Sequence, residues 1–503
     1  MNLAGIKNHF TNWRGWEMNP IVIKELRQGV RSWTVTGMLL LFLVVLFVTS
    51  IGFLLTQSFE ISQNMQLGGS MFSAFMVILA GASIFFIPLY TGVRVAAERQ
   101  ANNPDLLYVS TLSPFRIIFG KFLCSAYIAV LFFSACMPFM AFTNLLRGVD
   151  LPTVFFILFF LFLVVCAANM IAIFLACLPA SLPFKILFAL GGLVASFLII
   201  GSLVGLSFEF MRSGVGAMMT GKDFWVGTAT TVGIGLMITG LFFVLSVALI
   251  SPPSANRALP VRLYLTAIWL IGGIFAFIWV VQTGEAERLT AWTVPTFLIM
   301  MPALLVVISN EDQLSLRVRR TIPQSPVKRF LAFFFYNGAA GGVLWVGGIL
   351  AATYSLAASA MVYFPKKVYS SPESSHWFAT TAFYAFAYGL TALFIQRKFF
   401  PRRPAKLTGL LAVLLAGGWA IAPGIVLFFV NQLSWKSIDR FQPGNIFNVF
   451  SIRDEPDVLN HEVLAGIWLL VMIVVNARWL RRQILNFQPA VSGTAVSPPP
   501  VPR

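Results

Sequence analysis

Charged side chains are scarce in this chain. Only 11% of its 503 residues are Asp, Glu, Lys or Arg, and 58% are hydrophobic. A soluble globular domain carries about 25% charged residues. Long uncharged runs are present instead, and roughly 20 apolar residues span a bilayer as a helix. These runs are continuous rather than alternating, which disfavours strands. The sequence therefore predicts an all-α polytopic membrane protein.

The apolar runs predict about twelve transmembrane helices. Two divergent halves of six helices each are one interpretation of this number. The expected spans are 33–55, 71–93, 118–143, 153–178, 185–208, 225–250, 261–282, 289–309, 334–360, 378–395, 407–430 and 462–477. They divide the chain into an N-terminal cytoplasmic segment with an interfacial amphipathic helix (1–32), a first six-span domain (33–250), a second six-span region (251–482) and a disordered, proline-rich cytoplasmic tail (483–503).

Basic residues are depleted from one side of this arrangement. With the N-terminus in the cytoplasm, 26 of the 35 Lys and Arg residues lie inside and 9 outside, whereas 6 of the 18 acidic residues lie inside and 12 outside. The net charge of +17 is then +20 inside (26 − 6) and −3 outside (9 − 12). Lys and Arg enrichment marks the cytoplasmic side. We expect both termini in the cytoplasm and a plasma-membrane location, in a bacterium the inner membrane.

The same charges argue against nucleic acid as a partner. They fringe the spans rather than forming a basic domain, and this position suits contact with anionic membrane lipids.

Ionisable groups are absent from the interiors of the expected spans. All eighteen Asp and Glu residues fall in loops or at span edges, and His9, His376 and His461 are expected outside the spans. Lys121 and Arg262 stand only at span entrances. Transporters driven by protons or sodium usually hold an ionisable group at depth. If this chain moves a substrate, the energy is expected to come from elsewhere.

Catalytic motifs are also missing. The stretch "GAMMTGKD" (216–223) has the glycine spacing of a phosphate-binding loop but carries Asp223 where a hydroxyl residue is required. "HEVLA" from His461 does not complete HExxH. The four cysteines, in the third and fourth spans, are expected to be small buried apolar side chains. We therefore expect no enzyme activity, no catalytic residues and no cofactor or metal site.

The segment before the first span has the pattern of an interfacial helix. In "MNPIVIKELRQGVRSW" (18–33), Asn19 is placed to cap the helix and Pro20 to begin it. Apolar residues, including Leu26, can share one broad face, while Lys24, Glu25 and Arg27 are expected mostly on the other. A simple membrane anchor remains the alternative interpretation.

A second polar segment, "AAERQANNPDLLYVSTLSPFRIIFGK" (96–121), separates the second and third spans. Asn103 and Ser113 each precede a proline, which predicts a short helix and then the start of the third span. Leu106 and Leu107 offer an apolar contact inside a frame of charged residues. This structure exceeds what a connector needs, and it predicts a docking element for a soluble partner. A solvated loop at the headgroups is the alternative.

These two segments resemble the permease subunits of ABC-2 type transporters. The resemblance rests on "NPIVIKELR" (19–27), Glu98–Arg99, Leu106–Leu107, "TLSP" (111–114) and Gly120–Lys121, in that order around two spans. In that family such elements couple the permease to a separate ATPase. The resemblance thus implies an interfacial helix with Asn19, Pro20, Lys24, Glu25, Leu26 and Arg27, and ATPase docking through Glu98, Arg99, Leu106, Leu107, Thr111, Pro114, Arg116, Gly120 and Lys121.

The chain departs from the family pattern in two places. Asn-Asn-Pro-Asp (102–105) stands where the family often has Gly-Thr before the leucines, and twelve spans replace the usual six. The second half can be a divergent copy, because Ser325–Pro326 in the loop 310–335 repeats the placement of Ser113–Pro114. An unrelated basic loop is the alternative.

The sequence thus favours the permease subunit of an ABC-2 type ATP-driven exporter. Its expected partners are a separate ABC ATPase subunit, membrane lipids and either a second permease or another copy of itself. Two alternatives stay open. One is a non-transporting membrane scaffold or mechanical component coupled to an ATPase, and the other is a polytopic membrane enzyme.

Overall fold

The structure of the chain is a computed structural model. It describes residues 20–57, 64–101, 113–146, 149–179, 182–364, 373–430, 442–450 and 455–490. Expected features at Asn19, Asn103, Leu106, Leu107 and Thr111 lie outside the described residues. The chain forms two compact units, Met1–Ser251 and Pro252–Arg503, and each is described by itself.

Twelve helices in the described part of the chain are long and apolar enough to cross a membrane, and no described residue is in a strand. These spans are Trp33–Leu55, Gly68–Glu98, Pro114–Leu145, Leu151–Cys177, Pro183–Arg212, Lys222–Ile250, Ala258–Thr283, Thr290–Ile308, Ala339–Tyr363, His376–Phe399, Lys406–Val430 and Val458–Asn486. Each overlaps one predicted span. The expectation of an all-α polytopic membrane protein is confirmed.

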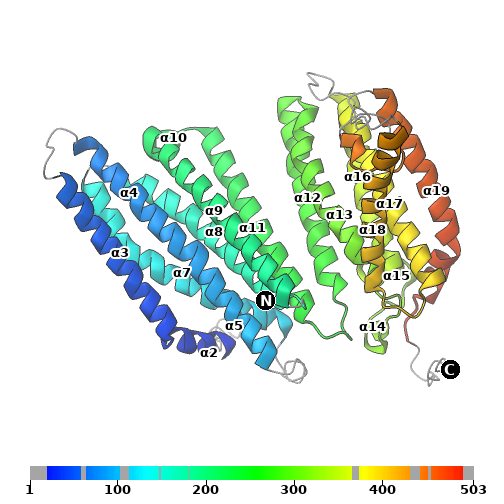
Figure 1. The fold of residues 1–503 in the computed structure, drawn as a ribbon, viewed down its shortest axis with the longest axis horizontal. Helices are drawn as coiled ribbons and strands as arrows, with labels where there is room; N and C mark the ends of the chain where they lie inside the picture. Colours follow the sequence, from blue (N-terminus) through cyan, green and yellow to red (C-terminus); the bar gives the residue numbers. More distant parts are fainter. Residues whose placement is uncertain are drawn as a thin grey trace, which may run out of the picture. The chain divides into compact units, whose positions relative to one another are not determined.

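The first unit holds six spans that run back and forth between two ends (Figure 1). Its helices are α2 (Pro20–Val30), α3 (Trp33–Gln57), α4 (Asn64–Gly81), η2 (Ala82–Phe86), α5 (Ile87–Ala101), α7 (Pro114–Leu145), α8 (Leu151–Cys177), α9 (Leu182–Ser213), α10 (Val215–Met218) and α11 (Lys222–Ile250). Large apolar side chains of α4, α7 and α8 form the core, where Phe72, Phe75, Phe132 and Leu161 are fully buried.

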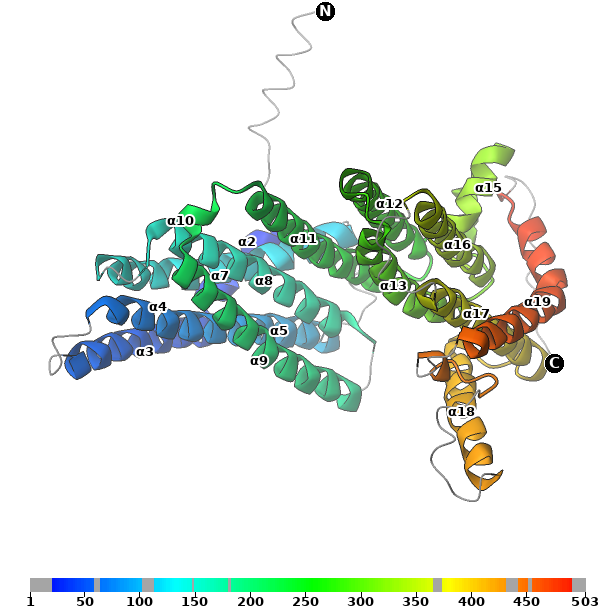
Figure 2. The ribbon, with the colours of Figure 1, turned by 90° about the horizontal axis from the view of Figure 1, so that it is seen from above.

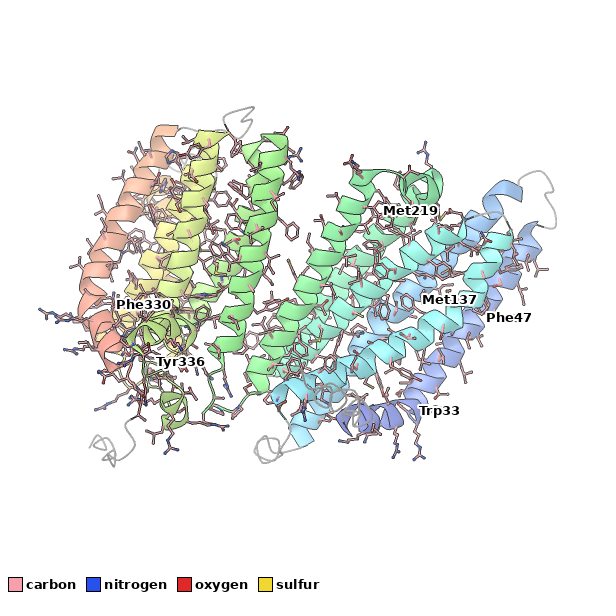
Figure 3. The ribbon with its side chains drawn as sticks, turned by 180° about the vertical axis from the view of Figure 1, so that it is seen from behind. Trp33, Phe47, Met137, Met219, Phe330 and Tyr336 are labelled. Carbon is pink, nitrogen blue, oxygen red and sulfur yellow. The ribbon has the colours of Figure 1, made fainter. Side chains whose placement is uncertain are left out.

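The outer faces of these helices remain apolar. Phe47 on α3 is 59% exposed and Trp33, at the start of that helix, is 83% exposed. Figure 3 shows Trp33 at the end of the unit where α2 lies and Met219 at the opposite end. Helices surrounded by lipid expose apolar side chains along their length and often carry a tryptophan at the membrane–water interface. The exposed residues of α3 follow this pattern.

The second span changes its winding near its middle. Between α4 and α5 the chain makes a π-helical turn at Ala82–Phe86, where the buried Ser83 hydroxyl donates to the Leu79 carbonyl. A π turn is uncommon in helices and often marks a functional position. It sets the register of α5, which carries the polar residues described below.

Two helix starts follow the proline signals in the sequence. Pro20 begins α2, and Pro114 begins α7 with Ser113 as its N-cap, whose hydroxyl accepts from the Arg116 amide at 3.4 Å. As predicted, the helix begun at Pro114 continues without a break into the third span.

The second unit also holds six spans. Its helices are α12 (Ala258–Thr283), η3 (Ala286–Leu289), α13 (Thr290–Ile308), α14 (Leu316–Arg320), α15 (Pro326–Phe335), α16 (Ala339–Tyr363), α17 (Glu373–Phe399), α18 (Lys406–Val430), η5 (Asn448–Phe450) and α19 (Glu455–Asn486). Figure 2 shows α18 at the edge of the unit, and most of its described residues are exposed or half-buried. In contrast, α17 buries many residues, among them Tyr384, Ala387 and Tyr388, so α17 is an interior helix.

The ninth span starts later than the sequence predicts. The apolar run from 334 is divided at Tyr336–Gly338, where Gly338 has a φ of 135° that favours glycine. The residues before the break form α15, whose Val327, Phe330 and Leu331 are exposed on one face. The helix begun at Ser325–Pro326 is therefore separate from its span, unlike α7.

The expected tail also begins inside a helix. Residues 483–486 continue α19, and the Phe487 ring lies 5.3 Å from that of Phe333 and 5.4 Å from that of Tyr336. Residues 483–490 thus belong to the folded second unit rather than to a disordered tail, because Phe487 is buried against α15.

Candidate functional site

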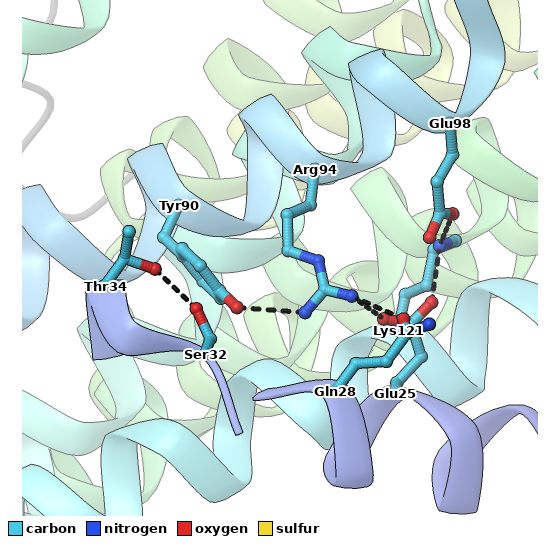
Figure 4. A network of polar contacts seen from close by, with 8 residues as sticks. All are labelled: Glu25, Gln28, Ser32, Thr34, Tyr90, Arg94, Glu98 and Lys121. Carbon is cyan, nitrogen blue, oxygen red and sulfur yellow. Dashed lines mark hydrogen bonds and ion pairs between the residues drawn. The ribbon is translucent and has the colours of Figure 1, made fainter. Parts of the chain in front are cut away.

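A cluster of charged side chains joins α2, α5 and α7 at one end of the first unit (Figure 4). Glu25 of α2 is at its centre. Its Oε1 lies 2.9 Å from the Lys121 ammonium of α7, and its Oε2 lies 3.5 Å from the Arg94 guanidinium of α5. Lys121 also pairs with Glu98 of α5. Two carboxylates and two cations therefore tie three helices together, and we call these four residues the ion network.

Arg94 extends the ion network along α2 and α5. Its Nη1 donates to the Tyr90 hydroxyl at 2.9 Å and its Nη2 donates to Gln28 Oε1 at 2.7 Å. Its guanidinium also lies 5.6 Å from the centre of the Tyr90 ring. The planar guanidinium is thus held by partners on two helices, which fixes its orientation toward Glu25.

The ion network is largely shielded from solvent. The side chains of Glu25 and Lys121 are 8% and 12% exposed, compared with 26% for Arg94 and 33% for Glu98. A shielded charge is costly unless it is paired and hydrogen bonded. Each of the four charges has a partner of opposite sign, so the cluster satisfies that condition.

The sequence of α2 explains why Glu25 faces inward. Val22, Glu25, Leu26 and Gly29 follow the i, i+3, i+4, i+7 spacing of one helix face, and all four are buried or half-buried. A Cβ atom on Gly29 would lie 3.9 Å from Cys124 Sγ. Gly29 therefore lies against α7, on the same face of α2 that brings Glu25 within reach of Lys121.

The assignment of Glu25 to the polar face is therefore wrong. Lys24 and Arg27 do point outward, and Leu26 is half-buried as expected. Ile23, placed on the apolar face by the sequence, is 37% exposed. The buried face of α2 therefore includes fewer of its apolar residues than the hydrophobicity pattern predicts. Glu25, paired with Lys121, lies in the middle of that face.

The structure brings together some of the expected docking residues. Glu98 and Lys121 meet in the ion network, so the segment 96–121, which the sequence presents as polar and water-facing, has Glu98 paired and only partly exposed. Gly120 is buried in α7, Arg116 is exposed one turn earlier, and Pro114 is the first residue of that helix. The remaining expected docking positions are Arg99, which contributes its backbone to α5, and Leu106, Leu107 and Thr111, which are outside the described residues.

Sequence patterns missed three members of this site. The sequence places Arg94 only among the charged residues that frame the segment between the second and third spans, and it predicts no role for Tyr90 or Gln28. The available signal was their helical spacing, since Tyr90, Arg94 and Glu98 recur every four residues and so lie along one side of α5.

A second polar cluster lies in the other unit, and it corrects the placement of the histidines. His461 is fully buried in α19, within a candidate span. Its Nδ1 lies 2.9 Å from the Tyr384 hydroxyl of α17 and its Nε2 lies 3.0 Å from Asn448 Oδ1. His376, also in a candidate span, pairs with Glu462 at 2.6 Å. The His461 bonds hold the segment 442–450 against α17 and α19, and the His376–Glu462 pair links α17 to α19, so both histidines have a structural role.

The described residues hold no group of three His, Cys, Asp or Glu side chains close enough to bind a metal ion. Comparison with known proteins adds no family assignment: no protein-family model matches the sequence, and no curated protein or solved structure shows significant similarity to it.

Proposed function

We propose that this integral membrane protein is the permease subunit of an ABC-2 type ATP-driven exporter, working with a separate ATPase subunit in the plasma membrane. The ion network is the observation that supports the proposal most. It binds the helix before the first span to the end of the second span and the start of the third. These are the elements through which an ATPase is expected to act.

The ion network makes these three elements respond as one body. The segment 102–112 is covalently continuous with α5 and α7, and Glu98 and Lys121 pair across those two helices. A movement imposed on that segment would therefore reach both spans and α2 together. Transport requires such a displacement to shift access from the inner to the outer side of the membrane.

The docking contact is tested by changing Leu106 and Leu107 together to Asp. Truncating a desolvated anchor costs about 1–3 kcal/mol, so the double change is expected to abolish association with the ATPase while the protein remains inserted. The chain is cross-linked in its native membranes and purified, and the ATPase that accompanies it is identified by mass spectrometry. Association and substrate-stimulated ATP hydrolysis are then measured on the same preparations.

A matched control places the same changes at the other end of the first unit, as Leu145→Asp with Leu151→Asp. Both leucines are exposed, and this variant should retain association. If association and activity survive the change at 106 and 107, those residues form only a connector. ATPase binding without stimulation by any exported compound would instead favour the scaffold.

The orientation is tested by impermeant maleimide labelling of intact cells. In a background without the native cysteines, Asp105→Cys and Arg320→Cys should stay unlabelled until the cells are opened, because both positions belong to the basic, inner side. Arg288→Cys, on the expected outer side, should be labelled at once. Labelling of position 105 or 320 from outside would contradict the proposed topology.

A further inference from the structure

An apolar groove runs through the second unit. Its volume is about 770 Å³, and α13, α16, α17 and α19 line it, with α15 at one end. Most of its lining side chains are apolar, and two of the polar ones already have partners: the Thr353 hydroxyl donates to the Ile349 carbonyl, and the Asn476 amide donates to the carbonyls of Leu390 and Met472. The groove therefore offers an occupant hydrophobic contact rather than hydrogen bonds.

Small residues of α16 create the groove. The wall from this helix includes Gly347, Gly348, Ala351, Ala357 and Ala358. A Cβ atom built on Gly348 meets nothing within 4 Å, and Tyr354 in the same wall is 40% exposed. Phenylalanine rings of α17, among them Phe383 and Phe386, face this side. The groove is thus a slot left open by missing side chains.

The groove is long enough to hold a lipid chain. The lining residues of α16 extend from Val343 to Met361, which is about 27 Å at 1.5 Å per residue. The hydrocarbon core of a bilayer is about 30 Å thick, and a chain from one leaflet crosses roughly half of it. An acyl chain would therefore occupy roughly half of the groove, and its presence there would remove apolar surface from any contact with water.

One end of the groove is positively charged. Phe330 and Phe334 of α15 line that end, and Lys328 and Arg329 precede Phe330 on the same helix. The segment 313–335 contains five basic residues and no acidic one. The exposed apolar face of α15 suits a helix lying at the headgroup level, where its cations would meet lipid phosphates.

A polar cavity of about 430 Å³ adjoins the same elements. Asp312, Arg319, Asn337 and Gln483 are among its lining residues, and α15 contributes Phe333. The Asp312 carboxylate already pairs with Arg397 at 3.6 Å and accepts from the Trp479 indole at 2.9 Å. The buried Nε atoms of Arg319 and Arg329 have no hydrogen-bond partner among the described residues. Guanidinium groups with N–H donors left over can bind a phosphate, and the adjacent apolar groove can hold an acyl chain. An anionic lipid requires both kinds of contact.

We infer that the second unit binds an anionic phospholipid, with an acyl chain in the groove and the phosphate headgroup at the basic end formed by α14 and α15. The inference is independent of the proposed ATPase partner, because it concerns the other unit and its test uses the purified full chain alone.

The test uses nanodiscs of phosphatidylcholine that contain phosphatidylglycerol with a photoreactive acyl chain. We expect cross-links to concentrate on α16 and α17. Gly348→Trp places an indole in the slot and should lower these cross-links about tenfold. Ser355→Trp is the matched control, since Ser355 is exposed on α16 but outside the groove, and it should leave them unchanged. Ala351→Leu provides a second filling change should Gly348→Trp unfold the protein.

The headgroup is tested with the same photoreactive chain on phosphatidylcholine. Labelling of the groove should be about tenfold weaker than with phosphatidylglycerol, and Lys328→Gln with Arg329→Gln should remove this difference. Equal labelling by both lipids in the parent protein would overturn the choice of an anionic lipid. Cross-links spread evenly over lipid-facing helices such as α3 and α16, and insensitive to Gly348→Trp, would overturn the site.

Discussion

Lys121→Met is expected to release α2 from the first unit. The change removes the cation that lies 2.9 Å from Glu25 and also pairs with Glu98. Glu25, with a side chain 8% exposed, would retain only Arg94 at 3.5 Å. Removing one partner of a buried ion pair costs about 3–5 kcal/mol, because the remaining charge stays shielded from water. At about 3 kcal/mol, the equilibrium between docked and released α2 shifts roughly 100-fold.

Cys124 reports this release. Its Sγ faces Gly29 of α2, and the residue is 6% exposed. In a variant whose only cysteine is Cys124, the rate of modification by a small maleimide in detergent should rise with the open population, by roughly 100-fold. The melting temperature of the protein should fall at the same time.

Lys24→Met is the matched control, since it makes the same chemical change on the exposed side of α2. It should leave both measurements nearly unchanged. The double variant Glu25→Met with Lys121→Met should be more stable than Lys121→Met alone, since no central carboxylate is left unpaired. An unaltered Cys124 rate in Lys121→Met would show that apolar packing alone holds α2.

Arg262→Met is expected to have a comparably large effect on the second unit. Arg262 is 2% exposed. Its Nη1 donates to the carbonyls of Phe334 and Tyr336, both at 2.8 Å, and its Nη2 donates to the Gly338 carbonyl at 3.2 Å. These acceptors belong to the end of α15 and to the turn before α16. The side chain of methionine supplies no donor to them, and of the three only the Gly338 carbonyl has a second donor among the described residues, the Gly342 amide at 3.4 Å.

An unsatisfied buried acceptor costs about 1–3 kcal/mol, so the loss of the bonds to the Phe334 and Tyr336 carbonyls should destabilise the second unit by on the order of 2–5 kcal/mol. Amide hydrogen exchange over 334–342 should accelerate more than exchange in the middle of α17. Arg262→Lys should recover part of the loss, because an ammonium keeps the charge without the fork of the guanidinium.

Arg288→Met provides the control for removing an arginine. Arg288 is 42% exposed and pairs with Glu285 three residues earlier; such surface pairs contribute under about 1 kcal/mol. Equal exchange rates over 334–342 in Arg262→Met and the parent protein would contradict the prediction. They would mean that the turn before α16 is stable without the hydrogen bonds of Arg262.

The spans could be predicted from the sequence because each depends on a local run of apolar residues. The tenth is instructive: the expected stretch 378–395 is short and aromatic, yet α17 extends from Glu373 to Phe399. Its polar residues, such as the buried Tyr384 and Thr380, face the protein instead of lipid. A helix inside the unit needs less hydrophobicity than one surrounded by hydrocarbon.

The ion network could not be predicted in the same way. Glu25 and Lys121 are 96 residues apart. The spacing within α2 aligns Glu25 with Val22 and Leu26, but it does not reveal that a cation on another helix is its partner. Tyr384 and His461 pose the same difficulty across 77 residues. A pattern of hydrophobicity assigns a charge to the outer face by default, and only the packing of α2 against α7 reverses that assignment for Glu25.

The equal numbers of carboxylates and cations in the ion network have an electrical consequence. Moving one elementary charge through the full membrane potential involves about 2.3 kcal/mol per 100 mV. Glu25, Glu98, Arg94 and Lys121 sum to zero, so a displacement that carries all four together does no net work against that potential. The ion network itself therefore adds no voltage dependence to a movement of α2, α5 and α7, and any such dependence would come from other charges such as the exposed Lys24 and Arg27.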